Sequence, residues 1–172
     1  KFMFPASWLV SRRLINDAGV WDERLSLDDD GEYMCRLVAA SDGVHFVPDA
    51  SCYYRVGNAG SLSTQKTDRA LRSSAMSLHL CIQQLLQLED SARTRNASLK
   101  LLQDNLPQFY PEHAELVQKL HAMAHALGGN LQPPGERPHF RLLRWALGWH
   151  AAKRLRGQLN GFRHFAQRMT EN

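Results

Sequence analysis

The sequence predicts an α/β segment over about the first third of the chain, followed by an all-α extension. Two short runs, residues 44–50 and 52–55, alternate apolar and polar side chains as half-buried strands do. From Thr64 onward, apolar residues instead recur at the spacing of amphipathic helices. The 172 residues are enough for one sizeable domain, and the 44% hydrophobic content suits a globular core.

The first part is expected to begin with a strand and a short helix. Residues 2–10 read as a buried strand or its end, with Pro5 limiting its regularity. Ser11 can cap a helix over residues 12–18, because its hydroxyl can accept a hydrogen bond from a free N–H of the first turn. Gly19 would end this helix in the position that glycine favours.

The extension is expected to contain three amphipathic helices between residues 65 and 129. Their apolar stripes end near Glu89, Pro107 and Gly128, and Pro111 is expected to begin the third helix. Residues 130–137 are rich in proline and glycine and are predicted to be a linker.

Cysteine content and hydropathy argue against a disulfide-rich protein and against a membrane-spanning one. Cys35, Cys52 and Cys81 are too few and too scattered for a disulfide framework, and they lack metal-binding spacing. A reducing compartment is the simpler interpretation, with the cysteines as small packing residues. The sequence contains no run of eighteen apolar residues, which is the length that would suggest a membrane span. The chain begins at Lys1 without a starting Met and partway through a structural pattern. We therefore interpret it as a fragment whose upstream part is missing.

An acidic segment is the most informative part of the chain. Four of the five residues from 28 to 32 are acidic, and Arg36 follows them. Glu32 and Arg36 are four residues apart and can pair on one helix face. Any of the three aspartates could cap a helix running to about Ser41, where the helix dipole favours negative charge. The segment is therefore either a solvated helix cap or a site that needs a base.

The surrounding residues resemble a known family. The run Gly19-x-Trp21-Asp22-Glu23-x-Leu25 is followed by Asp29-Asp30-Gly31-Glu32-x-x-x-Arg36, by the two strand-like runs and by Ser61-Leu62-Ser63. This ordered set, over residues 1–64, resembles the C-terminal signature of family 2 glycosyltransferases. The resemblance implies the C-terminal, acceptor-side half of a GT-A (Rossmann-like) domain, followed by the helical extension.

The resemblance also implies an activity. Asp30 corresponds to the general base of inverting members, which takes the proton from an acceptor hydroxyl as that oxygen attacks the anomeric carbon of a nucleotide-sugar. The family usually has Glu at the position of Asp29, so which of the two aspartates is the base stays open. Glu32 and Arg36 would hold the motif helix in place, while Asp29 would assist or contact the acceptor.

Further site residues and partners follow from the same resemblance. Arg55 and Ser61 would border the active site and contact substrate phosphates or the acceptor, although Arg55 could equally pair with a surface acid. A divalent metal, Mg²⁺ or Mn²⁺, would be bound mainly by the upstream half, so no metal site is expected within this chain. The expected acceptor is a saccharide or a lipid-linked glycan of the cell surface.

The C-terminal segment is strongly basic. Residues 137–172 contain eight Lys or Arg and one acid, a net charge of +7, whereas the whole chain carries +4 and the remainder therefore −3. Residues 138–172 read as an amphipathic helical tail with tryptophans on its apolar face. Either the segment 138–168 binds an anionic membrane surface, or it packs on the rest of the protein. Nucleic acid is the less favoured partner, because the aromatic side chains do not alternate with the basic ones.

Two functions are therefore open. The first is an inverting glycosyltransferase fragment that is cytoplasmic and peripheral on the inner face of the cell membrane. The alternative is a non-enzymatic, basic helical adaptor that binds a membrane surface or a partner protein, with a purely structural acidic segment.

Overall fold

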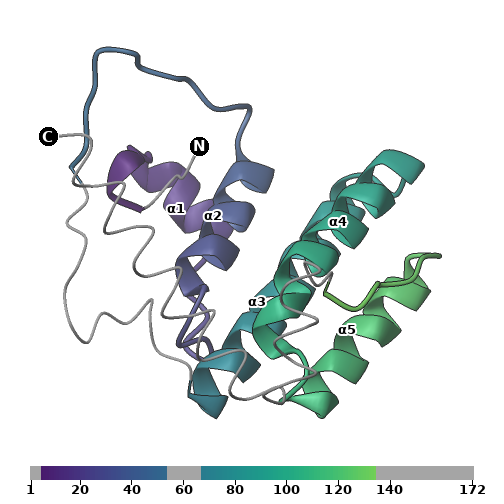
Figure 1. Cartoon of the computed structure of the whole chain (residues 1–172). Helices are drawn as coiled ribbons and strands as arrows, with labels where there is room; N and C mark the ends of the chain where they lie inside the picture. Colours follow the sequence, from purple (N-terminus) through teal and green to yellow (C-terminus); the bar gives the residue numbers. More distant parts are fainter. Residues whose placement is uncertain (1–4, 54–66, 135–172) are drawn as a thin grey trace, which may run out of the picture. The chain divides into compact units, whose positions relative to one another are not determined.

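The computed structural model describes residues 5–53 and 67–134, and the regular structure of these residues is entirely helical (Figure 1). A short 3-10 helix, η1, is followed by five α-helices. Their bounds are η1 Pro5–Ser7, α1 Arg12–Ala18, α2 Asp29–Ala40, α3 Asp68–Leu88, α4 Ala92–Phe109 and α5 Ala114–Ala126. The chain divides into two compact units, residues 1–133 and 134–172, and the division falls inside the expected linker 130–137. All of these helices belong to the first unit.

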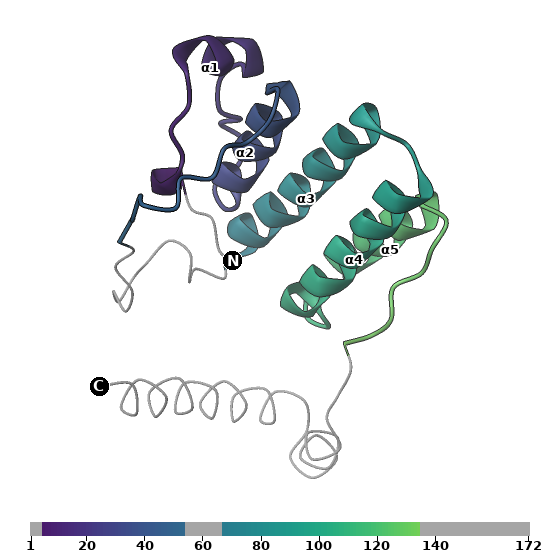
Figure 2. The same ribbon diagram turned by 90° about the horizontal axis from the view of Figure 1, so that it is seen from above.

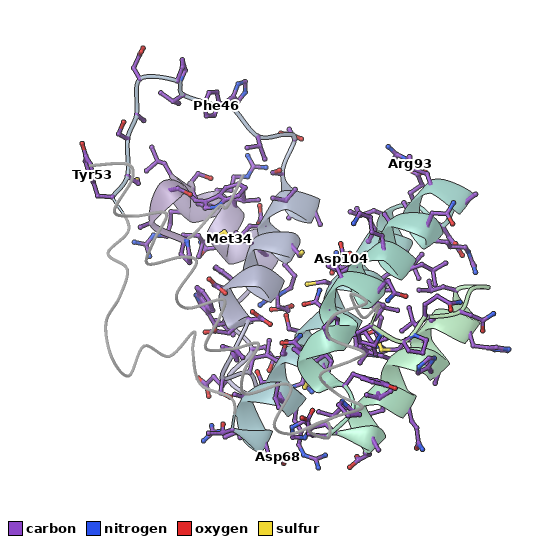
Figure 3. All side chains as sticks on the ribbon, viewed as in Figure 1. Met34, Phe46, Tyr53, Asp68, Arg93 and Asp104 are labelled. Atoms are coloured by element: carbon purple, nitrogen blue, oxygen red, sulfur yellow. The ribbon has the colours of Figure 1, made fainter. Side chains whose placement is uncertain are left out.

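The prediction of an α/β, Rossmann-like fold is wrong for the part of the chain that the structure describes, which holds no strand. Residues 8–10 and 44–47 are irregular, and residues 5–7 form a single helical turn. A segment with this alternating pattern forms a strand only where a neighbouring strand pairs with it and another layer covers one of its faces. Val44 and Tyr53 are instead 58% and 96% exposed, so these side chains do not pack in a core. Figure 3 shows Phe46 and Tyr53 on the extended chain beyond α2.

The first two helices begin and end close to where the sequence predicts. The Ser11 hydroxyl accepts a hydrogen bond from the Leu14 N–H at 3.2 Å, which confirms its role as a cap. Gly19 follows α1 with φ of +79°, a conformation that glycine adopts without steric cost. The helix predicted to run to about Ser41 is α2.

Helices α3, α4 and α5 lie side by side and enclose the main hydrophobic core (Figure 2). The core side chains that are fully buried come from α4 and α5: Leu102, Leu106, Phe109, Leu120 and Ala124. The prediction of three helices in this region is confirmed, but two of its boundaries are wrong. Helix α4 continues through Pro107 to Phe109, because burial of the Phe109 ring holds the last turn in the core. Helix α5 begins at Ala114 and not at Pro111.

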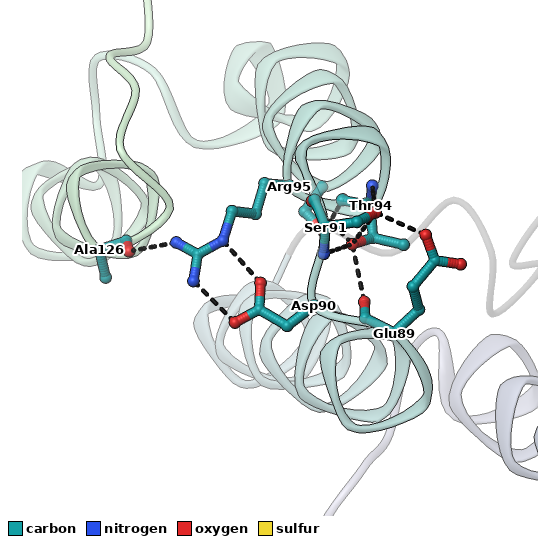
Figure 4. A network of polar contacts seen from close by, with 7 residues as sticks. Glu89, Asp90, Ser91, Thr94, Arg95 and Ala126 are labelled. Atoms are coloured by element: carbon teal, nitrogen blue, oxygen red, sulfur yellow. Dashed lines mark hydrogen bonds and ion pairs between the residues drawn. The ribbon is translucent and has the colours of Figure 1, made fainter.

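The turn between α3 and α4 is held by a dense polar network (Figure 4). Ser91 and Thr94 form a reciprocal capping box, in which each side chain accepts a hydrogen bond from the backbone N–H of the other residue. Arg95 pairs with Asp90 at 2.6 Å and reaches the Ala126 carbonyl oxygen at the end of α5. These contacts order the α3–α4 turn and link the start of α4 to the end of α5.

Candidate functional site

Helix α2 carries the acidic segment and lies between α1 and α3, with its more extensive contact against α3. Its inward face buries Tyr33 and Leu37, which are 5% and 3% exposed. The three aspartates lie at the start of the helix. The position of these carboxylates is therefore set by the elements against which α2 packs.

The predicted pair of Glu32 and Arg36 is present and largely buried. The Arg36 Nε and Nη2 atoms donate to the two carboxylate oxygens of Glu32 at 2.8 and 3.1 Å. The Glu32 side chain is only 7% exposed and that of Arg36 is 22% exposed. The guanidinium also donates to the carbonyl oxygens of Ala18 and Val20 at 2.7 and 2.9 Å. Arg36 thus ties α2 to the chain that leaves α1.

An aromatic stack lies beside this pair. The rings of Trp21 and Tyr33 are stacked with centroids 4.4 Å apart, and the Arg36 guanidinium lies 5.0 Å from the centroid of the Tyr33 ring. The exposed Arg24 guanidinium donates to the carboxylate of Asp22 at 2.8 and 2.5 Å, and this hydrogen bonding lowers the pKa of Asp22 to about 2. The motif residues at 19–25 therefore shape the turn and support α2.

Asp28 precedes α2 in a strained conformation. Its φ of 57° and ψ of 24° place it in the left-handed region, which non-glycine residues rarely adopt. Its side chain makes no capping hydrogen bond to the helix, contrary to one of the predicted roles. The Ser74 hydroxyl donates to its carboxylate at 2.6 Å, and the Ser77 hydroxyl donates to its carbonyl oxygen at 2.8 Å. Asp28 is therefore held by α3.

Asp29 and Asp30 differ from their acidic neighbours. Both are partly exposed residues of the first turn of α2. Among the contacts that the structure describes, the Asp29 side chain has no partner, and Asp30 Oδ1 accepts only from the adjacent Gly31 N–H at 2.9 Å. The acids of the segment thus fall into two pairs. Asp28 is bound by Ser74 of α3 and Glu32 by Arg36 of its own helix, whereas Asp29 and Asp30 make no ion pair within the described residues.

The other expected site residues, Arg55 and Ser61, lie outside the described residues, as does all of the basic tail 138–172. Within residues 5–53 and 67–134, no group of three or more His, Cys, Asp or Glu side chains is arranged to hold a metal ion. In the same residues, no helix is both long enough and apolar enough to cross a membrane.

The serines of α3 contribute to the site and were not predicted from the sequence. Ser73, Ser74 and Ser77 are 5%, 0% and 4% exposed and face the acidic segment. A signal was present, because these small polar residues interrupt the apolar stripe of α3 at helical spacing. Buried hydroxyls need hydrogen-bond partners, and that requirement could have pointed to a polar contact with a neighbouring element.

Two of the cysteines also face each other across α2 and α3. A hydrogen bond between the thiols of Cys35 and Cys81 lowers the pKa of Cys35 to about 7 and raises that of Cys81. Both residues are half-buried, whereas Cys52 is exposed. The sequence predicts packing roles for all three cysteines and gives no sign of this pair.

Comparison of the chain with protein-family models, with curated proteins and with solved structures finds no match.

Proposed function

We propose that this chain carries the acceptor-side acidic site of an inverting glycosyltransferase, with Asp29 or Asp30 as the general base. One observation supports this most: two carboxylates in the first turn of α2 have oxygens without an ion-pair partner in the described residues, while the acids on either side are engaged. An aspartate is ionised at neutral pH and can accept a proton.

The proposed reaction is a single displacement at the anomeric carbon of the donor. The base takes the proton of an acceptor hydroxyl while that oxygen forms a bond to the anomeric carbon. The bond from the anomeric carbon to the diphosphate oxygen breaks, and the nucleoside diphosphate leaves with the electron pair. Attack opposite the leaving group inverts the configuration. Proton removal by a positioned side chain contributes roughly a hundred- to ten-thousand-fold in rate.

The Glu32–Arg36 pair supports the base in this proposal without touching the substrate. A buried two-point contact to Arg36, extended to the carbonyl oxygens of Ala18 and Val20, resists rotation of α2. A base must be held within hydrogen-bond reach of the proton that it removes, so a rigid helix serves catalysis. Arg55 and Ser61 remain proposed contacts to donor phosphates or acceptor.

The donor site is proposed to lie outside this chain. As the family resemblance implies, the divalent cation that such enzymes use, Mg²⁺ or Mn²⁺, is proposed to be bound mainly by an upstream nucleotide-binding part. When bound there, the cation supplies charge stabilisation for the departing diphosphate. The proposed acceptor is a saccharide or a lipid-linked glycan, and the proposed location is the cytoplasmic face of the cell membrane.

The test is sugar transfer by a polypeptide that carries this chain together with the nucleotide-binding part. Asp30→Asn and Asp29→Asn keep the size of the side chain and remove the basic oxygen. We expect one of the two to lose at least a hundredfold in kcat. The matched control is Asp104→Asn, which lies on α4 and pairs with the exposed Lys100. Full activity of both Asp29 and Asp30 variants would overturn the assignment.

The adaptor function has no comparable support in the described residues, because the basic segment on which it rests lies outside them. Binding of the tail to anionic lipid is compatible with the enzyme, since it would bring the site to a lipid-linked acceptor.

A further inference from the structure

The buried serines of α3 contact the turn that leads into α2 through five hydrogen bonds. Ser73 Oγ accepts from the N–H groups of Ser26 and Leu27 at 2.7 and 2.9 Å, and it donates to the Leu27 carbonyl oxygen at 2.8 Å. The bonds of Ser74 and Ser77 to Asp28 complete the set. Two elements nearly fifty residues apart in the sequence are thus joined by hydroxyls that are all largely buried.

These bonds act where the backbone is strained. The left-handed conformation is unfavourable for a non-glycine residue, and it persists when its surroundings fix it. Both the side chain and the carbonyl oxygen of Asp28 are bound by α3, so its conformation is fixed at two points. Asp28 is also the last residue before α2, and its conformation sets the direction in which Asp29 and Asp30 leave the turn.

The contact extends into the helical bundle. The Gln108 amide of α4 donates to Ser74 Oγ at 3.2 Å, so the hydroxyl that binds Asp28 is itself oriented from α4. A row of hydrogen bonds therefore runs from α4 through α3 to the acidic turn. A serine that served only the packing of its own helix would bond within that helix, as the buried Ser98 does to the Thr94 carbonyl oxygen.

We infer that Ser73 and Ser74 are positioning residues for the acidic site, and that the helices α3 and α4 orient the proposed base through them. This inference rests on the proposed function, because it assigns the purpose of the strained turn to Asp29 and Asp30. It gives the helical region a part in the reaction: the region fixes the geometry of the proton acceptor.

The first arm of the test is hydrogen exchange on the full chain, which needs no substrate. Ser73→Ala removes the acceptor of the Ser26 and Leu27 amides, and their exchange should become about five- to tenfold faster, the factor expected for one hydrogen bond. Ser98→Ala removes an equally buried hydroxyl that lies on α4, and it should leave these two amides unchanged. Unchanged exchange in Ser73→Ala would overturn the inference.

The second arm is sugar transfer, measured well below the unfolding temperature of each variant. Ser74→Ala and Ser73→Ala should lower kcat about tenfold or more, since small misplacements of a catalytic group are costly, and leave KM for the donor unchanged. Ser73→Thr retains the hydroxyl and should recover most of the loss. A kcat equal to that of Ser98→Ala would refute the positioning role. If the Asp29 and Asp30 variants were both fully active, the proposed function would fail, and the exchange arm would still decide whether the serines hold the turn.

Discussion

Arg36→Ala is expected to destabilise the first unit by about 3 kcal/mol, because it leaves a buried carboxylate without its partner. Glu32 is 7% exposed in its side chain and accepts two of the four hydrogen bonds that Arg36 donates. Breaking a buried ion pair by removing one partner costs about 3–5 kcal/mol. The lower end of this energy range applies here, because water can reach the two other acceptors of Arg36. These are the carbonyl oxygens of Ala18, which is half-buried, and Val20, which is exposed.

The chain offers a matched control in Lys100→Ala. Lys100 and Asp104 are also four residues apart on one helix, and their charged atoms are 2.6 Å apart, but the side chains are 75% and 60% exposed. Exposed pairs of this kind contribute about 0.3–0.5 kcal/mol. Two variants with the same sequence spacing should therefore differ about sixfold or more in their effect on the free energy of unfolding. Burial is the physical reason.

Urea unfolding followed by circular dichroism measures both free energies of unfolding. The double variant Glu32→Leu with Arg36→Leu should recover much of the loss, because it removes the unpaired charge together with its partner. An Arg36→Ala variant within about 1 kcal/mol of the native chain, or equal to Lys100→Ala, would contradict the view that Arg36 holds α2 in place.

Three further predictions concern other regions. Alkylation of Cys35, followed by mass spectrometry, should rise with pH around a midpoint near 7, because its thiolate is stabilised by the Cys81 thiol. Cys81→Ala should move this midpoint upward. The prediction is refuted if Cys35 of the native chain lacks the low midpoint. Leu102→Ala should cost about 2–5 kcal/mol in urea unfolding, because its side chain is 0% exposed. Leu101→Ala, at a site 37% exposed, should cost much less, and equal losses would contradict the described core. Replacing the Lys and Arg residues of 138–168 with Gln should abolish co-sedimentation with phosphatidylserine vesicles, and equal binding of the native chain to neutral vesicles would exclude electrostatic recognition.

Local signals in the sequence predicted much of the helical structure. Ser11 and Gly19 mark the ends of α1 because capping depends on a few adjacent residues. The pairing of Glu32 with Arg36 follows from their four-residue spacing, which is also local. The three helices of the extension are predicted from apolar periodicity together with proline and glycine at their ends, and each buries one face in a shared core.

Non-local contacts explain what the sequence did not predict. Residues 44–53 have the alternation of a strand, yet a strand also needs a partner, and the pattern carries no information about whether one is present. Pro107 does not stop α4, because the buried Phe109 favours one more turn. The left-handed Asp28 depends on Ser74 and Ser77 from another helix, and no local rule connects residues so far apart.

The rate of sugar transfer by Asp29→Asn and Asp30→Asn, compared with Asp104→Asn in the same polypeptide, tests the proposed base most directly. If one of these aspartates removes the acceptor proton, its variant loses at least a hundredfold in kcat, retains donor affinity and unfolds at the same urea concentration as the native protein. Native rates in both variants would contradict the proposal and leave the acidic turn with a structural role alone.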